Sequence, residues 1–433
     1  MGEKPEAIGV GLFGLGTVGS GVVRLLEEHR EELAEEIGHP LVIRKAVVQN
    51  IAKERAVSVD PALLSTEAEA ILDDPEIRVV IEVIGGIEPA RTYILEALKR
   101  GKHVVTANKD LMALHGAELI DVARAHGCDL FYEASVGGGI PIIRTLIDGF
   151  ASDRITKIYG IINGTTNYIL TQMSRRGRSF EEALREAQAL GYAEADPSSD
   201  VDGLDAARKM VILATLGFHM PIGLEDVTTQ GIRGLEARDI AFAEEFGYAV
   251  KLLGTALREN GHVEIGVFPT LVPKDHPLAN VHDVFNAVFV YGEAVGETMF
   301  YGRGAGSLPT ATAVVSDVVA AVKNMLLGVS GKRLSRPYRE KKLKEPSEIK
   351  NRFYFRLTVQ DSPGVLAHIT QDLSQSGVSI ERIVQYPNQE SGEADILIIT
   401  HTTSLAQLDE ALGRIRRMPA LRRIHTVLRV LAM

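Results

Sequence analysis

The chain has 433 residues, of which 45% are apolar and 24% charged, so it can bury a core and is not expected to be disordered. Its net charge of -10 argues against binding to nucleic acid or to an anionic membrane as a whole. The single cysteine, Cys128, excludes an intrachain disulfide. With no secretion signal at the start and no run of 18 apolar residues, we expect a cytoplasmic protein without a membrane span.

The first 150 residues alternate between strand and helix patterns. Strands are predicted at 7–13, 41–48, 78–84, 102–106 and 129–133, and helices at 17–37, 61–72, 88–100 and 110–126. This alternation predicts an α/β fold with a Rossmann-type doubly wound parallel sheet as domain 1–150.

Residues 151–330 are less regular. Strand-like runs at 154–162 and 263–272 accompany helix patterns at 179–190 and 202–217, which indicates a mixed α+β substrate domain. Residues 331–352 are basic and poor in apolar side chains. A nucleic-acid patch is conceivable there, but we favour a solvated linker.

The last segment, 353–433, begins with a clean alternation. Phe353, Phe355, Leu357 and Val359 share one face of a predicted strand. The elements that follow are a helix at 363–376, strands at 378–386 and 393–401, a helix at 404–417 and a strand at 422–431. The order βαββαβ predicts a ferredoxin-like domain.

A glycine-rich loop follows the first predicted strand. Gly14 permits a tight turn, Gly16 lets the backbone approach a pyrophosphate, and Gly19 allows the helix to pack closely on the strand. Thr17 and Val18 open that helix, whose free N–H groups favour phosphate. The motif alone is weak evidence, and a glycine turn without ligand is the alternative, but its place between strand and helix predicts a dinucleotide site.

The end of the second predicted strand bears on the choice of cofactor. It carries Gln49 and Asn50 where NAD enzymes usually have a carboxylate for the ribose, and Lys53 and Arg55 follow. Cations there favour a 2′-phosphate. We therefore expect NADP or NAD, with NADP slightly favoured.

Four further segments suggest a catalytic site. They are 105–109 (VTANK), 132–141 (YEASVGGGIP), 160–168 (GIINGTTNY) and 191–209 (GYAEADPSSDVDGLDAARK). Asp205 and Lys209 share a helix face, although their spacing fits a structural ion pair equally well. Lys109 follows the end of a strand, at the edge where doubly wound sheets bind ligands. The glycines of 136–141 expose backbone that could bind a ligand or a small cation, or form a plain loop.

With these segments, the first 330 residues resemble homoserine dehydrogenases, in the order of that family's motifs. The resemblance implies that residues 151–330 serve catalysis and dimerisation. It implies that Lys209 is the acid/base and that Asp205 binds substrate beside it. Lys109 would lie between cofactor and substrate, and it is the alternative residue for moving the proton. It further implies that Glu194 holds the substrate amino group, that Gly191 lies near both substrate and cofactor, and that Thr106 and Gly306 contact the cofactor.

The resemblance also implies a structural sodium ion. Glu133 and the backbone of Val136, Gly138 and Ile140 would bind it. One departure concerns the cofactor, because Gln49-Asn50 stands where many relatives carry Arg-Asp.

The implied reaction interconverts L-homoserine and L-aspartate 4-semialdehyde in the biosynthesis of threonine, methionine and isoleucine. NAD(P)H supplies the hydride and a lysine supplies the proton. One alternative is an aspartate-semialdehyde dehydrogenase type of enzyme, whose acyl intermediate would need Cys128 as a thiolate. Another is a non-catalytic amino-acid sensor with an inactive Rossmann domain.

Residues 353–433 resemble an ACT domain, through their element order and the turn 361–366 (DSPGVL). Gly364 would let the polar ends of an amino acid approach the backbone, and Gln385 would contact it from a neighbouring copy. The resemblance implies feedback inhibition by L-threonine and at least a homodimer. A passive dimerisation module is the alternative.

Overall fold

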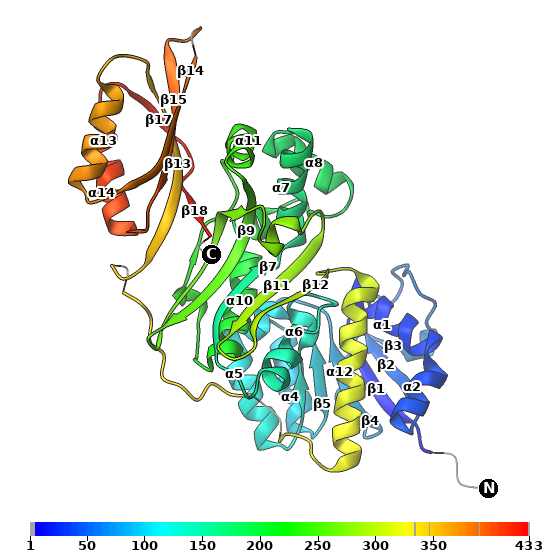
Figure 1. Ribbon diagram of the computed structural model, residues 1–433. Coiled ribbons are helices and arrows are strands. Elements are labelled where there is room, and N and C mark those ends of the chain that lie inside the picture. Colours follow the sequence, from blue (N-terminus) through cyan, green and yellow to red (C-terminus); the bar gives the residue numbers. More distant parts are fainter. Residues whose placement is uncertain (1–4, 333–334, 346, 389, 432–433) are drawn as a thin grey trace. The chain divides into compact units, whose positions relative to one another are not determined.

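The computed structural model describes residues 5–332, 335–345, 347–388 and 390–431 (Figure 1). The outermost residues of the predicted domains 1–150 and 353–433, and three residues of the predicted linker 331–352, lie outside these ranges. The chain forms two compact units: the first takes residues up to 158, then 208–226 and 285–341, and the second takes 159–207, 227–284 and the residues from 342 onward. The segment 151–330, which we expected to be one continuous domain, is thus divided between the two units.

A six-stranded sheet lies at the centre of the first unit, in the order β3-β2-β1-β4-β5-β6, and all neighbouring strands are parallel. Its strands are β1 (Ile8–Phe13), β2 (Leu41–Val47), β3 (Leu64–Ser65), β4 (Ile77–Glu82), β5 (His103–Thr106) and β6 (Leu130–Phe131). This order, which reverses between β1 and β4, is that of dinucleotide-binding folds. The prediction of a doubly wound Rossmann-type sheet is confirmed.

Six helices accompany this sheet: α1 (Thr17–Glu28), α2 (Arg30–Ile37), α3 (Glu69–Leu72), α4 (Ala90–Lys99), α5 (Lys109–Ala125) and α12 (Ser307–Leu327). The helix predicted at 17–37 is broken at His29 into α1 and α2. The helix predicted at 61–72 is wrong in large part, because β3 interrupts it. Leu64 and Ser65 pair with β2, so sheet formation overrides the local helix pattern there.

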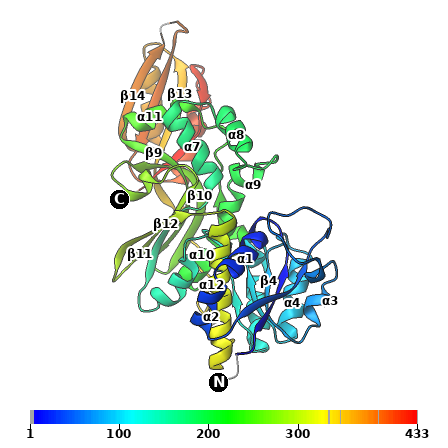
Figure 2. The same cartoon turned by 90° about the vertical axis from the view of Figure 1, so that its right-hand side faces the viewer.

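Helix α12 comes from a distant part of the sequence, yet it packs beside α1 (Figures 1 and 2). Val314 and Val318 belong to the same core cluster as Val10 and Ile81 of the sheet. By length and composition alone, α12 is the one helix among the described residues that could cross a membrane, and half of its apolar window is buried. Its place in this core accounts for its apolar character.

The first unit also contains the short helix α6 (Ile142–Arg144) and an antiparallel hairpin of β11 (Phe285–Gly292) and β12 (Gly296–Arg303). Strand β7 (Ile155–Ile161) and helix α10 (Leu204–Phe218) each continue from one unit into the other. Helix α10 was predicted at 202–217, and it carries both Asp205 and Lys209.

The second unit contains the helices α7 (Gly164–Arg176), α8 (Phe180–Ala189), α9 (Ser198–Val201) and α11 (Ala237–Glu245), and the strands β8 (Val227–Thr229), β9 (Tyr248–Glu259) and β10 (His262–Pro273). Its C-terminal part contains β13 (Lys350–Gln360), α13 (Val365–Gln375), β14 (Ile380–Asn388), β15 (Glu393–Thr400), β16 (Thr403–Ser404), α14 (Leu405–Ile415), β17 (Leu421–Ile424) and β18 (Leu428–Val430). The predicted ferredoxin-like order is confirmed. Phe355 and Leu357 of its sheet pack with Ile369, Leu373 and Leu408 of its helices.

The last strand differs from the prediction of one strand at 422–431. Residues 425–427 interrupt it, and β17 and β18 both pair with β13. Strand β18 also pairs in parallel with β10, and Leu431 N–H donates to the Leu271 carbonyl at 2.9 Å. The order β9-β10-β18-β13-β15-β14 therefore makes one continuous sheet within the second unit.

A buried ion network lies beside this shared strand. The guanidinium of Arg356, which is 2% exposed, contacts Asp239 and Glu236, each at 2.6 Å. His425 Nδ1 lies 3.2 Å from Glu236. Glu236, Asp239 and His425 are close enough together to bind a metal ion. Arg423 also lies 3.0 Å from Glu236, so two guanidinium groups face the two carboxylates, and we interpret the cluster as a structural ion network.

The predicted linker is not simply solvated. Its ion pairs are Arg336–Asp121 at 2.7 Å, Lys341–Asp226 at 2.8 Å and Lys344–Glu259 at 2.8 Å. The ring of Tyr338 stacks on His219 with 4.5 Å between centroids. These three basic residues of the segment therefore each pair with a carboxylate of their own unit.

Candidate active site

The glycine loop after β1 has the geometry that its sequence requires. Gly14 has a φ of 99°, in the region open to glycine. A Cβ on Gly16 would meet nothing within 4 Å, whereas one on Gly19 would lie 2.2 Å from the Gly14 carbonyl oxygen. The loop thus leaves room for a ligand at Gly16, and Gly19 permits α1 to begin close to the strand.

A cavity of about 460 Å³ adjoins this loop at the carboxyl ends of β1, β2 and β4. Its walls include Gly14, Gly16, Gln49, Asn50, Lys53, Arg55 and Glu88. Arg55 donates to the carbonyls of Ile51 at 2.9 Å and Lys53 at 2.7 Å, so it holds the loop together. Sequence reasoning overlooked Glu88, which follows β4. Its carboxylate accepts from the Thr92 hydroxyl at 2.8 Å.

The start of α12 lies against the start of α1. The Ser307 hydroxyl donates to the Thr17 carbonyl at 2.7 Å. Gly306, the residue before α12, has a φ of 127° and is exposed. Two helix N-termini therefore meet beside the glycine loop, where their N–H groups favour an anion. This contact places Gly306 near the predicted cofactor residues Thr17 and Val18.

Thr106, at the end of β5, is fully buried, and its hydroxyl donates to Glu82 at 2.6 Å. Only its backbone is therefore available to a cofactor. Glu82 also accepts from the Ile84 N–H at 2.8 Å, and burial raises the pKa of its carboxyl. The sequence signal for this role is a carboxylate inside the apolar run 78–84.

Lys109 is the first residue of α5, which Asn108 caps. The Asn108 side chain accepts from the Leu111 N–H at 3.0 Å and donates to the Gly86 carbonyl at 2.6 Å. Lys209 lies on α10. The residues next to these two lysines, Asp110 and Arg208, form an ion pair at 3.0 Å. The structure therefore brings the helix turns that carry Lys109 and Lys209 next to each other.

Asp205 is buried and held by Asn163. The Asn163 amide donates to Asp205 at 2.9 Å and to Asp200 at 2.7 Å. Its oxygen accepts from the Thr166 N–H at 2.8 Å and so caps α7. Sequence reasoning included Asn163 in a conspicuous segment but gave it no role. The structure indicates a positioning residue that orients the Asp205 carboxylate.

Gly191 and Glu194 lie on the exposed loop after α8. This loop belongs to the second unit, and so does Asp205 of α10. Gly191 has a φ of 74°, and the Gln188 amide donates to the Glu194 carbonyl at 3.0 Å. Thr165 donates to the Tyr192 carbonyl at 2.6 Å, which ties the loop to α7.

The predicted cation-binding turn, 133–140, is tightly folded. The Glu133 carboxylate is buried and accepts from the Ile143 N–H at 2.7 Å and the Arg144 N–H at 2.8 Å, at the start of α6. Glu133 N–H donates to Asp317 at 2.8 Å. Gly138 has a φ of 53°, and a Cβ there would lie 2.5 Å from the Gly304 carbonyl oxygen.

Cys128 is buried, and this burial raises the pKa of its thiol to about 11. A thiol with such a pKa is almost fully protonated near neutral pH and is a poor nucleophile. The geometry thus gives no support to an acyl-enzyme mechanism.

Comparisons with known proteins identify each part of the chain. The profile "Homoserine dehydrogenase, NAD binding domain" matches residues 14–133, "Homoserine dehydrogenase" matches 141–319, and "ACT domain" matches 353–420. A homoserine dehydrogenase of Bacillus subtilis is 52% identical over 426 residues, which cover 98% of each chain. The chain belongs to the homoserine dehydrogenase family. It is an oxidoreductase with a nicotinamide-nucleotide-binding domain and a C-terminal ACT domain.

Solved structures agree with this assignment. The crystal structure of a homoserine dehydrogenase from Thiobacillus denitrificans is 40% identical, with a TM-score of 0.91 and 99% of each chain covered. A hyperthermophilic archaeal homoserine dehydrogenase in complex with NADPH is 27% identical, with a TM-score of 0.60, over 73% of this chain and 97% of that one. Both the acyl-enzyme and the inactive-sensor alternatives are set aside by these matches.

The role of Asn163 can be tested with Asn163→Ser. Serine can still cap α7, but it lacks the amide that donates to Asp205 and Asp200. We expect kcat/KM for homoserine to fall roughly tenfold or more, while KM for the cofactor stays constant. Asn280→Ala, at an exposed position of the same unit, is the matched control. An equal loss in both variants, or an altered cofactor KM, would contradict a positioning role.

Proposed function

We propose that this homoserine dehydrogenase interconverts L-homoserine and L-aspartate 4-semialdehyde in the cytoplasm, in the biosynthesis of threonine, methionine and isoleucine, and that L-threonine inhibits it through the ACT domain. The observation that carries the catalytic part is the ion pair between Asp110 and Arg208, because it joins the turns that bear Lys109 and Lys209. The cofactor loop leads into the same unit.

The residues have separate roles in this proposal. When bound, the nicotinamide cofactor supplies or accepts the hydride. The Lys209 ammonium donates a proton to the substrate oxygen as the alcohol forms, and takes it back in the reverse direction. The Asp205 carboxylate binds substrate, oriented by Asn163. Glu194 and Gly191 bind the amino end, and Lys109 lies between cofactor and substrate.

A nicotinamide absorbance assay with L-homoserine, at pH 7 to 10 and with each cofactor, tests the reaction. We expect reduction of NADP and of NAD. A flat absorbance under all of these conditions would refute the activity. The same assay with other small hydroxy amino acids, such as serine, defines the substrate class.

We propose NADP as the modestly preferred cofactor. Lys53 supports this preference, because it lines the cavity beside the glycine loop and its ammonium has no ion-pair partner among the described residues. The archaeal relative that was solved with NADPH is a second support. The Lys53 ammonium would attract the negatively charged 2′-phosphate of NADP, whereas the neutral ribose hydroxyl of NAD does not require a positive charge.

Lys53→Ala is therefore expected to lower kcat/KM for NADP about tenfold, since one charge-assisted contact is lost. The efficiency with NAD should change less than twofold. Steady-state rates with both cofactors at saturating homoserine measure this ratio. Lys99→Ala, on the exposed face of α4, is the matched control. An equal decrease for both cofactors would show that Lys53 does not discriminate between them.

We propose that the turn 133–140 binds a sodium ion through Glu133 and the backbone of Val136, Gly138 and Ile140. Gly137 and Gly138, with φ values of 75° and 53°, support this, because glycine leaves the backbone unshielded for a small cation. Replacing sodium by a large organic cation in the buffer should lower the thermal unfolding midpoint. An unchanged unfolding midpoint would contradict sodium binding and would indicate that the turn serves close packing alone.

The ACT effector site is supported by a cavity of about 410 Å³ whose walls include Gly364 and Gln385. Gly364 precedes α13 with a φ of 93°, and the Gln385 amide donates to Asp361 at 3.0 Å. We expected Gln385 to contact the ligand from a neighbouring copy of the chain. Because Gln385 lines the same cavity as Gly364 of its own chain, it could also contact a ligand bound within one chain. An amino acid carboxylate suits the N–H groups of α13. Sedimentation should report at least a dimer, as we propose.

A further inference from the structure

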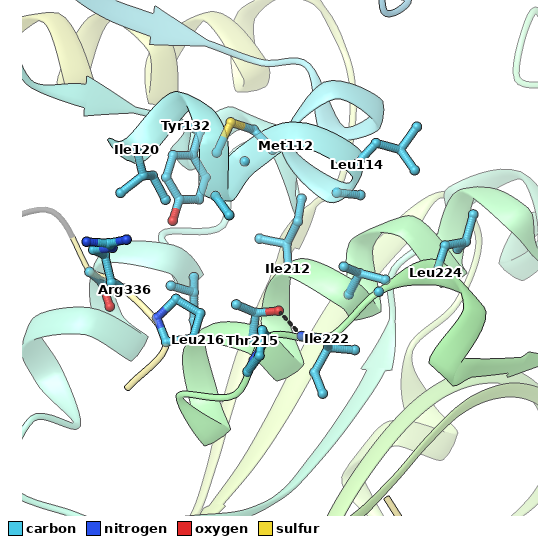
Figure 3. A pocket seen from close by; sticks show the side chains of 18 of the residues that line it. Met112, Leu114, Ile120, Tyr132, Ile212, Thr215, Leu216, Ile222, Leu224 and Arg336 are labelled. Carbon is cyan, nitrogen blue, oxygen red and sulfur yellow. Dashed lines mark hydrogen bonds between the residues drawn. The ribbon is translucent and has the colours of Figure 1, made fainter. Parts of the chain in front are cut away.

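A cavity of about 300 Å³ lies in the first unit between α5 and α10, apart from the predicted cofactor and substrate residues (Figure 3). We name it the α5–α10 cavity. Apolar side chains of the two helices and of the segment after α10 form most of its wall, notably Met112, Ile120, Ile212, Leu216, Ile222 and Leu224. Its size is at the lower end of small-molecule sites, and its apolar wall is typical of them.

One buried polar group faces this cavity without a partner. Tyr132 is 7% exposed, and its hydroxyl has no hydrogen-bond partner among the residues that the structure describes. Figure 3 shows the phenol oxygen directed into the space between Ile120 and Leu216. Burial and the charges of Glu133 and Asp317 raise the pKa of Tyr132, so its hydroxyl stays a donor. Buried tyrosine hydroxyls normally find an acceptor, and here a ligand could provide it.

A positive charge lies on the same wall. Arg336, in the segment that leads toward the ACT domain, lines the cavity and pairs with Asp121 of α5 at 2.7 Å. One carboxylate does not use all five donors of a guanidinium. Glu225, the acid on this wall, is largely exposed and lies 3.8 Å from Lys341. Tyr132 and Arg336 thus both offer donors to the cavity, beside the hydroxyls of Thr215 and Ser335, which can donate as well as accept.

We propose that the α5–α10 cavity binds a small apolar carboxylic acid, whose body contacts the apolar walls and whose carboxylate accepts from the Tyr132 hydroxyl and the Arg336 guanidinium. The apolar body of such a ligand matches the wall, and its carboxylate would be a second acceptor for Arg336 beside Asp121. It would contact the two helices that carry Lys109 and Lys209. Its effect on turnover rests on the proposed function, but its binding does not.

Isothermal titration of octanoate into the full chain, without substrate or cofactor, tests the proposal. We expect one site per chain, and binding roughly tenfold weaker or worse in Tyr132→Phe, which lacks the donor. Tyr301→Phe, an exposed tyrosine of β12, is the matched control and should bind as the wild type does. Ala117→Phe, at the exposed mouth of the cavity, should abolish binding by filling it.

Three outcomes would overturn the proposal. They are no heat at millimolar octanoate, unchanged affinity in both Tyr132→Phe and Ala117→Phe, and equal affinity for octanol, which lacks the carboxylate. Thermal unfolding is a second readout, because octanoate should raise the midpoint of the wild type and not that of Ala117→Phe. Both readouts are independent of the homoserine assay, so failure here and failure of the proposed function are distinguishable.

Discussion

Replacing Lys209 by alanine is expected to lower kcat by about 10²–10⁴-fold, the range that general acid–base groups contribute. The affinity for the cofactor should hardly change, since Lys209 lies on α10 and the glycine loop lies between β1 and α1. Stopped-flow measurement of hydride transfer and a fluorescence titration with NADPH separate these two quantities. A variant that retains more than half of the wild-type turnover would refute the assignment.

Both alanine variants, Lys209→Ala and Lys109→Ala, are expected to lose most of their turnover, so the loss alone does not show which lysine moves the proton. Chemical rescue can distinguish the two lysines. Only the lysine that moves the proton should be rescued by added methylamine, with rates that depend on the pKa of the amine. Lys99→Ala is again the matched control. If only Lys109→Ala responds to amines, the two roles are exchanged.

Replacing Gln385 by alanine is expected to raise the L-threonine concentration for half inhibition at least about tenfold, since a hydrogen bond to a charged ligand is lost. Turnover without threonine should stay unchanged, because Gln385 lies in the ACT domain. Inhibition requires that threonine bind one conformation of the enzyme better than another. Rate measurements across a threonine titration, together with calorimetry, test both the binding and the coupling.

Gln371→Ala is the matched control, as an exposed glutamine on α13 whose side chain lies outside the Gly364–Gln385 cavity. It should be inhibited as the wild type is. If the full chain shows neither heat of binding nor loss of rate at millimolar threonine, the domain has another ligand or only a structural role. Binding without inhibition would refute the feedback proposal.

Local sequence patterns predicted those parts of the fold whose structure depends mainly on residues that are close together in the sequence. Five of the six parallel strands and the glycine loop follow from apolar runs bounded by turns, whereas the two-residue strand β3 was not predicted. Strand β9 was not predicted, because it is buried along most of its length on both faces and lacks the alternation that marks a half-buried strand. The segment that forms α12 was placed in the domain 151–330, because only tertiary packing brings Val314 into the same core as Val10.

The candidate site shows the same division. The charged candidate residues could be identified from their spacing and from the family resemblance. They are Lys109, Asp205 and Lys209. The groups that orient them could not, because the contacts Asn163–Asp205 and Thr106–Glu82 join residues 42 and 24 positions apart. Nor could periodicity indicate that the basic residues of 331–352 would find carboxylate partners.

Strand β18 limits how freely this regulatory domain could be exchanged between enzymes. The ACT profile ends at residue 420, and β18, which begins at Leu428, forms ladders with both β13 and β10. A chimaera cut at residue 420 would lose β18 and leave the edge of β10 unpaired, which promotes aggregation. Arg356 lies within the exchanged segment, so a domain without this arginine would leave Asp239 buried without its cation. A workable exchange would have to carry β18 with the domain and match the carboxylates of α11, so the two parts have to evolve together.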